Sequence, residues 1–323
     1  MKPFLVLSLS ILALFPLYGQ RETAVLLPSS YTVSLDFTMG TKYGQVEEIV
    51  YVNSSSDTKL SELLWDLKPL FYWGVVVDYA PVDPRTKGFF FRAALQAGLP
   101  GKTGLMEDRD WLAPKNALSH LSRHENYTEG AWFFDLTAGL SLPFFSKMWV
   151  QAYGALHYMN FYWVSRDGYK QYAEQINDEY QPWDPSLPKE PFFGPGIAYS
   201  QDWLIFAPGL SLHVFISKYL NAGLSFQISP LIMGVALDDH WQRSLQFIDS
   251  VYFGLFMEPQ GELVFSPHER FDISLNLSYR FIRGSRGATR SMYTINGATD
   301  SSPKGGGASY YVLDGGLSLT VRF

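Results

Sequence analysis

The chain contains no cysteine among its 323 residues, which excludes disulfides, a thiolate metal site and a lipidated cysteine. Charged residues are also scarce, at 17% of the sequence, and the formal net charge of −6 argues against binding to nucleic acid. After the start of the chain, no stretch reaches 18 uninterrupted apolar residues, so the sequence predicts no membrane-spanning helix there. In a membrane, such a chain can satisfy its backbone only as a closed β-barrel.

The first residues have the composition of a secretory signal. Lys2 supplies a positive charge, an apolar run follows over residues 4–18, and Gly19 is a small residue near a cleavage point. The run is short for a membrane-spanning helix, which needs about 20 residues. We therefore expect a signal peptide over 1–19 and a single barrel domain over 20–323, with an uncleaved anchor as the alternative.

Long alternating segments, rich in aromatic residues, make up most of the remaining chain. The clearest covers residues 271–281, where apolar and polar side chains alternate throughout. Residues 31–39 and 60–73 repeat the pattern, and in the second of these we expect Leu63, Trp65 and Phe71 to share one face. Segments of about ten residues with large apolar side chains on one face and ionised groups on the other are typical of a transmembrane barrel. A soluble sandwich would instead bury the apolar face.

Ten such segments lie near residues 30–53, 58–79, 87–99, 129–142, 147–166, 196–216, 219–236, 249–266, 270–286 and 307–323. Most connections alternate in length. The short ones fall at 80–86, 143–146, 217–218 and 267–269, and the long polar ones at 100–128, 167–195, 237–248 and 287–306; residues 53–57 join the first two segments. The predicted fold class is therefore all-β: a ten-stranded antiparallel transmembrane β-barrel with long extracellular loops and both termini on the periplasmic side.

The seventh segment changes its alternation at Ser229-Pro230. Apolar residues occupy the even positions over 220–228 and the odd positions over 231–237. We expect a bulge at this point, where proline is tolerated. The change turns Asp238 and His240 toward the interior of the barrel.

Asp238 and His240 form an Asp-x-His pair whose side chains point the same way on a strand. A carboxylate that accepts one ring N–H fixes the tautomer and leaves the other nitrogen basic. A second acidic pair, Asp108 and Asp110, starts another long connection, and the two pairs would face each other across a barrel mouth. Taken alone, Asp-x-His also fits a solvated loop acid beside a histidine at the rim.

Two other constellations have simpler explanations. Ser122 lies near His124 and Asp110 in the sequence, but no strand-to-helix elbow frames it, so we interpret it as a loop hydrogen bond and not as a serine triad. His120 and His124 are four residues apart, as zinc ligands on a helix are, but the glutamate of that motif is missing. We predict neither a metal nor a cofactor.

Several short motifs occur in a characteristic order: Met39-Gly40-Thr41, Glu47-Glu48, Val50-Tyr51, Lys59–Trp65, Asp108-Arg109-Asp110-Trp111, Ser122-Arg123-His124, and the segment from Leu220 through His240. In this ordered set the sequence resembles the omptin family, the outer-membrane aspartyl-histidyl endoproteases, over nearly the whole mature chain. The resemblance implies an enzyme in the cell outer membrane whose active site faces the extracellular side. It also implies peptide or protein substrates with basic residues and contact with outer-membrane lipid.

The resemblance carries five residues over to this chain. Asp238 and His240 match the catalytic dyad, Asp108 and Asp110 match the opposing catalytic pair, and Glu48 matches an acidic residue in the pocket for the basic side chain before the cleaved bond. The implied reaction is hydrolysis of a peptide bond next to a basic residue by water. His240 would act as general base and Asp238 would orient it, without a covalent intermediate.

The chain departs from the family pattern at three places. The second acidic residue of the basic pocket falls on Ala236, which predicts a weaker preference for arginine or lysine. An aspartate of the next subsite falls on His120. The patch that grips lipopolysaccharide is not recognisable around Leu156 to Met159, which weakens the expectation of a dependence on that lipid.

Two alternatives of another class remain. The chain would also suit a non-catalytic omptin-like barrel acting as an adhesin or receptor, or a narrow porin. Ten strands enclose a narrow lumen, and we expect a set of inward ionised groups to fill it, which argues against a wide pore. That set is Asp36, Glu62, Asp66, Lys68 and Arg280.

Overall fold

The computed structural model describes residues 31–52, 58–284 and 286–323. The expected signal peptide over 1–19 and the connection over 53–57 lie outside these described residues. Nearly all of the described chain is β-strand, and its two single-turn helices are η2 (Pro114–Asn116) and η3 (Trp241–Arg243). Among the same residues, none of the helices is long and apolar enough to span a membrane.

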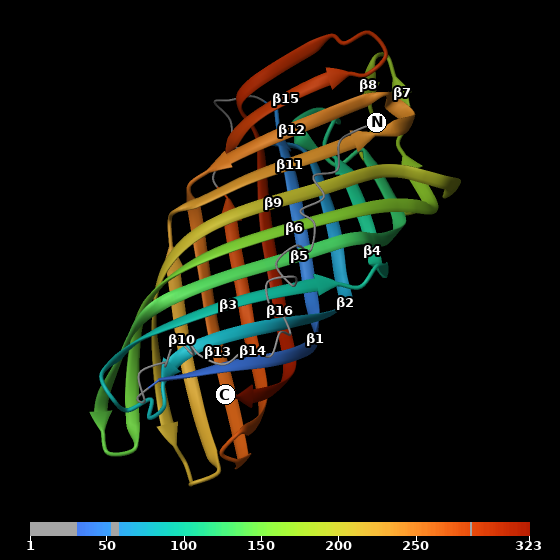
Figure 1. Ribbon diagram of the computed structural model, residues 1–323. Coiled ribbons are helices and arrows are strands. Elements are labelled where there is room, and N and C mark those ends of the chain that lie inside the picture. The colour runs from blue at the N-terminus through green and yellow to red at the C-terminus, as the bar shows by residue number, and fades with distance from the viewer. Residues whose placement is uncertain (1–30, 53–57, 285) are drawn as a thin grey trace, which may run out of the picture.

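The strands form one antiparallel ring (Figure 1). Six segments cross it as single strands: β1 (Tyr31–Tyr51), β2 (Lys59–Pro81), β5 (His120–Phe145), β6 (Met148–Tyr172), β9 (Glu190–Phe215) and β16 (Thr299–Arg322). Four more cross it as two strands in line: β3 (Gly88–Gly98) with β4 (Gly101–Asp110), β10 (Leu220–Ser229) with β11 (Ile232–His240), β12 (Leu245–Tyr252) with β13 (Gly254–His268), and β14 (Phe271–Gly284) with β15 (Gly287–Tyr293). The ladder between β1 and β16 closes the ring, which confirms the predicted ten-stranded barrel.

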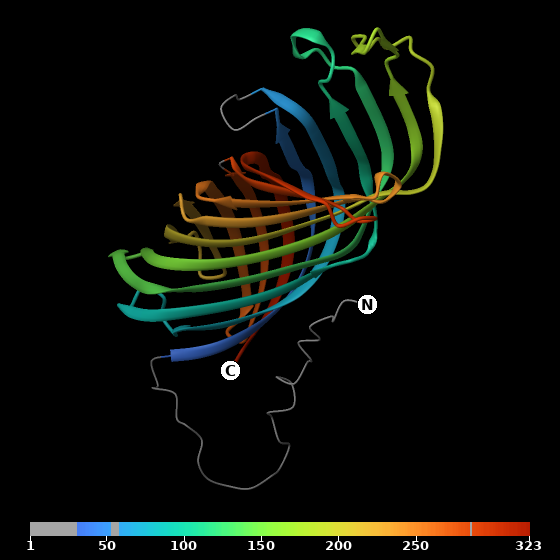
Figure 2. The ribbon, with the colours of Figure 1, turned by 90° about the horizontal axis from the view of Figure 1, so that it is seen from above.

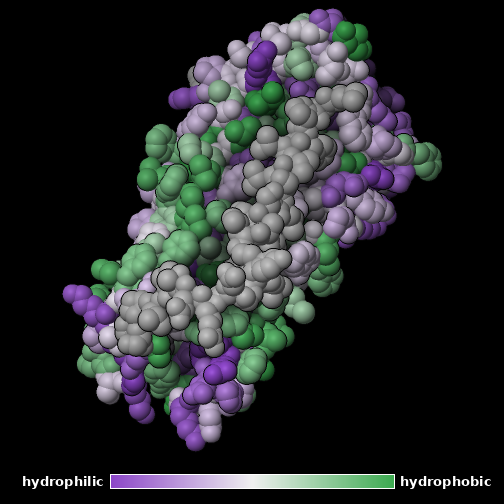
Figure 3. Space-filling model, viewed as in Figure 1, coloured by the Kyte–Doolittle hydropathy of each residue, from purple (hydrophilic) through white to green (hydrophobic). Residues whose placement is uncertain are grey.

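The outer face of the barrel carries a band of exposed apolar side chains, as the alternation predicts. On β14, the side chains of Leu275 and Leu277 are exposed, whereas those of Asp272 and Ser274 are buried in the interior. Figure 3 shows hydrophobic residues gathered along the lower body of the barrel and hydrophilic residues at the turns below. Exposed apolar residues on every second position are what contact with lipid requires, so this band is the membrane-spanning part.

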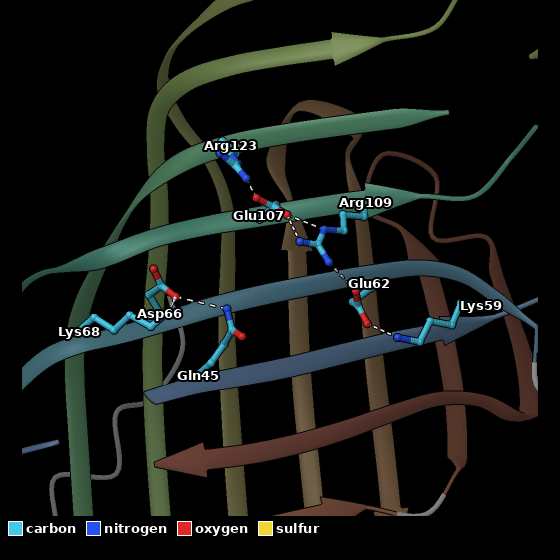
Figure 4. A network of polar contacts seen from close by, with 8 residues as sticks. All are labelled: Gln45, Lys59, Glu62, Asp66, Lys68, Glu107, Arg109 and Arg123. Carbon is cyan, nitrogen blue, oxygen red and sulfur yellow. Dashed lines mark hydrogen bonds and ion pairs between the residues drawn. The ribbon is translucent and has the colours of Figure 1, made fainter. Parts of the chain in front are cut away.

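The barrel continues beyond this band with a polar outer face. On β4 the outward residue Leu105 is followed by Glu107 and Arg109, and an ion-pair network joins these across three strands (Figure 4). It runs from Arg123 on β5 through Glu107 and Arg109 to Glu62 on β2. Ionised outward groups of this kind belong in water, so this end of the barrel rises above the bilayer.

The burial of side chains on β2 differs from one expectation of the sequence. Leu63, Trp65 and Phe71 do not share a face: Phe71 points to lipid, whereas Leu63 and Trp65 are buried in the barrel interior. The ladder to β1 shifts by one residue between the pairs Lys42–Leu70 and Gly44–Leu67, which reverses the alternation. The predicted lumen set is therefore wrong for Glu62, Asp66 and Lys68, which interact outside the upper barrel with the neighbours that Figure 4 draws.

Arg280 is correctly predicted to lie inside, where it organises a buried polar cluster at the level of the membrane. Its guanidinium donates to Glu258 at 2.9 Å and lies 3.6 Å from Asp135. Asp135 also contacts Nδ1 of His157 at 2.5 Å, and Nε2 of the same ring lies 2.7 Å from the Gln227 side chain. These contacts reach across the lumen and narrow it, which argues against a wide pore.

We expect Arg280→Ala to lower the free energy of unfolding by about 3–5 kcal/mol, because it leaves the Glu258 and Asp135 carboxylates buried without their cation. Urea unfolding in lipid vesicles, followed by tryptophan fluorescence, measures the difference. Arg85→Ala is the matched control, since Arg85 pairs with Asp83 at an exposed turn where such pairs contribute little. Equal stability of the two variants would contradict this role for Arg280.

The predicted bulge is present between β10 and β11. Gln227 pairs with Gly209 and Ile232 pairs with Ile205. The chain therefore advances five residues from β10 to β11 while β9 advances four, which leaves one extra residue. The Ser229 hydroxyl accepts a hydrogen bond from the Leu231 N–H at 2.9 Å, which stabilises the irregular backbone. The extra residue reverses the alternation and turns the end of β11 inward.

Candidate active site

Asp108 and Asp110 lie on β4 and point into the barrel. The sequence predicts a loop at these residues, but β4 pairs with β2 on one side and with β5 on the other. Both faces of this strand are polar, so it lacks the apolar alternation that marks the membrane-level strands. Asp108 lies opposite Leu63 on β2 and Ser122 on β5, and the Ser61 hydroxyl donates to its carboxylate at 3.4 Å.

Asp238 and His240 end β11, inside the barrel, with 2% and 7% of their surfaces exposed. The sequence also predicts a loop from residue 237 onward, but β11 continues as a strand to His240. Nε2 of His240 lies 2.6 Å from the Asp238 carboxylate, a contact that requires the proton on Nε2 and leaves the lone pair on Nδ1. Burial lowers the pKa of His240, but the carboxylates of Asp238 and Asp108 outweigh it and raise the pKa above its usual value.

The two acidic pairs lie on opposite walls of the barrel. Around the ring at this level, β5, β6 and β9 separate β4 from β11 on one side, and five strands separate them on the other. The walls are nevertheless close enough for their charges to interact. Burial and the neighbouring Asp110 raise the pKa of Asp108 to about 7, and the positive charges of His240 and Arg243 oppose this shift. The structure thus brings the four predicted residues around one opening.

Glu48 points into the same opening from β1, with 1% of its surface exposed. Burial and the carboxylates of Asp238 and Asp249 raise its pKa well above the usual range. Asp249, on β12, also belongs to this group, although no motif in the sequence marks it. It lies directly opposite Ala236 in the ladder between β11 and β12, so its position depends on pairing between strands and not on a motif.

An aromatic layer forms the floor beneath these acidic groups. Trp65 stacks on Tyr199 with ring centroids 5.2 Å apart, and Trp163 stacks against both. The charge of Glu48 helps burial to raise the pKa of Tyr199, which shows that the layer lies close to that carboxylate. The floor separates the acidic opening from the polar cluster in the membrane-level lumen.

The remaining rim residues have local partners. The Ser122 hydroxyl lies 3.0 Å from Nε2 of His124, and Nδ1 of that ring contacts the Asp167 carbonyl at 3.0 Å, so no carboxylate completes a triad. His120 contacts the Ser119 hydroxyl at 2.8 Å. Over residues 31–52, 58–284 and 286–323, no three His, Asp or Glu side chains are arranged to hold a metal ion.

The ends of the strands form a platform beside the opening. Figure 2 shows the loop after β4 and the hairpin of β7 (Gln175–Ile176) and β8 (Glu179–Tyr180) extending together past the rest of the barrel. Backbone hydrogen bonds join them, from Ala173 to Ser119 and from Trp183 to Leu118. The opening is therefore flanked by ordered backbone that a long ligand could contact.

The closed ring of ten strands, its lipid-facing band and the raised polar end define an outer-membrane β-barrel. A family model described as the Omptin family matches residues 29–323. The chain therefore belongs to the omptin family.

One solved structure supports the fold. The outer membrane protease OmpT from Escherichia coli matches with a TM-score of 0.81 and 18% sequence identity, over 94% of this chain and 99% of that chain. The toluene transporter TodX from P. putida matches with a TM-score of 0.30 and 7% identity, over 92% of this chain and 91% of that chain. A search of curated proteins finds no match.

Proposed function

We propose that this protein is an outer-membrane endopeptidase that cleaves peptide bonds next to basic residues, at the extracellular mouth of the barrel. The observation that carries the proposal is the buried hydrogen bond between His240 and Asp238, opposite the carboxylate of Asp108. A carboxylate-oriented imidazole facing a second acidic pair has the parts needed for general acid–base hydrolysis. Family membership and the similarity to an outer membrane protease support the same conclusion.

The reaction follows from the protonation states of these groups. Nδ1 of His240 removes a proton from a water molecule in the opening, and the water oxygen attacks the carbonyl carbon of the peptide bond. Asp238 stabilises the resulting imidazolium through the Nε2–H hydrogen bond. The pKa of Asp108 is raised to about 7, so its protonated form is present below that pH, and this form gives a proton to the leaving amine as the C–N bond breaks.

The charge of the opening favours a cationic substrate. Glu48, Asp238 and Asp249 contribute three buried acidic side chains, and Asp108 and Asp110 contribute two more, while few cations face them. Arg243 on η3 is the cation that faces the Asp108–Asp110 pair, and it also interacts with Tyr172. Concentrated negative charge between low-dielectric walls attracts basic peptides from solution.

We expect the detergent-folded protein to cut a fluorogenic peptide that has arginine before the scissile bond. A matched peptide with citrulline, which keeps the shape but lacks the charge, should have kcat/KM at least about tenfold lower. Steady-state kinetics with the two peptides measure the ratio. Folded protein that cuts neither peptide would contradict the proposal and favour an adhesin or receptor, and ion conductance in planar bilayers would favour a porin.

A further inference from the structure

Two carboxyl groups in the opening have no cationic partner. The Oε2 atom of Glu48 and the Oδ2 atom of Asp249 are both buried and have no hydrogen-bond partner, and each residue has only 1% of its surface exposed. No lysine or arginine in the described ranges forms an ion pair with either of them. Buried carboxylates without a cation are costly, so each of these groups either keeps a proton or is stabilised by a positive group that enters the site.

The surroundings of Asp249 hold its carboxylate in place. The Thr289 hydroxyl donates to Oδ1 at 2.5 Å, while Oδ2 remains free. Gly306 on β16 lies against the same carboxylate, and a β-carbon at that position would overlap it. The threonine donor and the glycine thus fix one orientation of the Asp249 carboxylate, with Oδ2 left without a partner inside the protein.

The pairing of β11 with β12 explains why an acid at 249 can serve the same opening as one at 236. Ala236 and Asp249 are directly opposed, and in an antiparallel ladder such residues have β-carbons about 4.5–5.5 Å apart on the same face. A carboxylate on Asp249 therefore lies within one side-chain length of the place that an acid at 236 would occupy. The two acids are also close enough to interact, because the charge of Asp249 is among the causes that raise the pKa of Glu48.

We propose that Asp249 and Glu48 together form the subsite that binds the cationic side chain of the residue before the cleaved bond, with Asp249 replacing the acid that is missing at Ala236. The inference rests on the proposed function and deepens it, because it assigns a residue that determines specificity. It also reverses the expectation of a weaker preference for basic residues. The aromatic floor under Glu48 adds flat surfaces, which suit a guanidinium better than an ammonium, so the subsite favours arginine over lysine.

The pair also makes substrate binding depend on pH. Burial raises the pKa of Asp249 to about 6, and the pKa of Glu48 lies well above its usual range. Asp238 and Asp108 are the other acids that interact with the pair, and Thr289 donates to it. The cation binds the ionised form, so KM for the arginine peptide should fall as the pH rises through about 6.

The test is the kinetics of Asp249→Asn with the arginine and citrulline peptides. This isosteric change keeps an oxygen for Thr289 but removes the charge. KM for the arginine peptide should rise about 10- to 100-fold, with a much smaller change in kcat and none for the citrulline peptide. The fall of KM near pH 6 should disappear. Asp239→Asn, a change at a partly exposed position of the neighbouring strand β11, is the control and should match the wild type.

Two further variants separate a lost charge from a damaged fold. Ala236→Asp in the Asp249→Asn background returns a carboxylate to the opposite strand and should restore most of the arginine preference. Gly306→Ala displaces the Asp249 carboxylate and should raise KM as Asp249→Asn does. If Asp249→Asn keeps the wild-type ratio between the two peptides, the subsite proposal is overturned.

A binding measurement distinguishes this outcome from failure of the proposed function. Benzamidine, a planar amidinium, is titrated calorimetrically into the folded wild type and into Asp249→Asn. Binding at least tenfold tighter by the wild type supports the subsite even if neither peptide is cut, a result that would count against the peptidase alone. Equal or absent binding by both proteins overturns the subsite whether or not the peptides are cut.

Discussion

His240→Ala should lower kcat for the arginine peptide by about 10²–10⁴-fold, because it removes the general base. KM should change little, since the imidazole is directed at the water and not at the basic side chain. Asp238→Asn should lower kcat as well. An asparagine amide donates where the carboxylate accepts, so it stabilises the tautomer with the lone pair on Nε2 and turns the base away from the water.

His268→Ala is the matched control for the loss of an imidazole. His268 ends β13 at the opposite end of the barrel, where its Nδ1 accepts the N–H of Arg270. This variant should keep the wild-type kcat, and circular dichroism should show the same barrel in all three variants. A folded His240→Ala protein that retains more than about a tenth of the wild-type kcat would remove His240 from the mechanism.

The membrane-level barrel could be predicted from the sequence because lipid imposes a strict rule on it. Outward residues there must be apolar and inward residues can be polar, so the alternation is visible, as on β14. The bulge at Pro230 could be predicted for the same reason, since the alternation reverses there. Proximity of Asp238 to His240 follows directly from their two-residue spacing on a strand.

Above the membrane the rule no longer applies, and the sequence becomes ambiguous. Glu107 and Arg109 face water while Asp108 and Asp110 face the opening, so β4 is polar on both sides and has the composition of a loop. On β2 the aromatic Trp65 suggested a lipid-facing residue. It is instead part of the interior floor, because the register shift below it reverses the face.

The role proposed for Asp249 depends on information that one strand does not contain. Nothing in the residues around 249 marks a binding site, and the assignment comes from its position opposite Ala236 and beside Glu48. Such a pairing joins residues that are 13 positions apart along the chain, through a tight turn at η3. An acidic residue on one strand can therefore replace an acidic residue on the neighbouring strand and still face the same opening. A search for motifs along the chain does not detect such a replacement.

Asp108→Asn should lower kcat by about 10²–10⁴-fold, because an amide cannot return a proton to the leaving amine. KM for the arginine peptide should stay near the wild-type value, since the basic side chain is held by other carboxylates. Glu107→Gln is the control: this neighbouring carboxylate lies on the outer face in the ion-pair network and does not reach the opening (Figure 4). It should leave kcat unchanged.

The pH profile of kcat tests the same residue independently. The pKa of Asp108 is raised to about 7, so its acidic form is present below that pH and is lost as the pH rises through it. The pKa of His240 is raised as well, and its basic form is lost as the pH falls below the raised value. The wild type should therefore show a bell-shaped profile, whose limbs belong to the coupled groups together. Asp108→Asn should lose the alkaline limb near pH 7 and retain the acidic one, because only the histidine still titrates. An alkaline limb at the same pH in Asp108→Asn would assign the proton donor to another group.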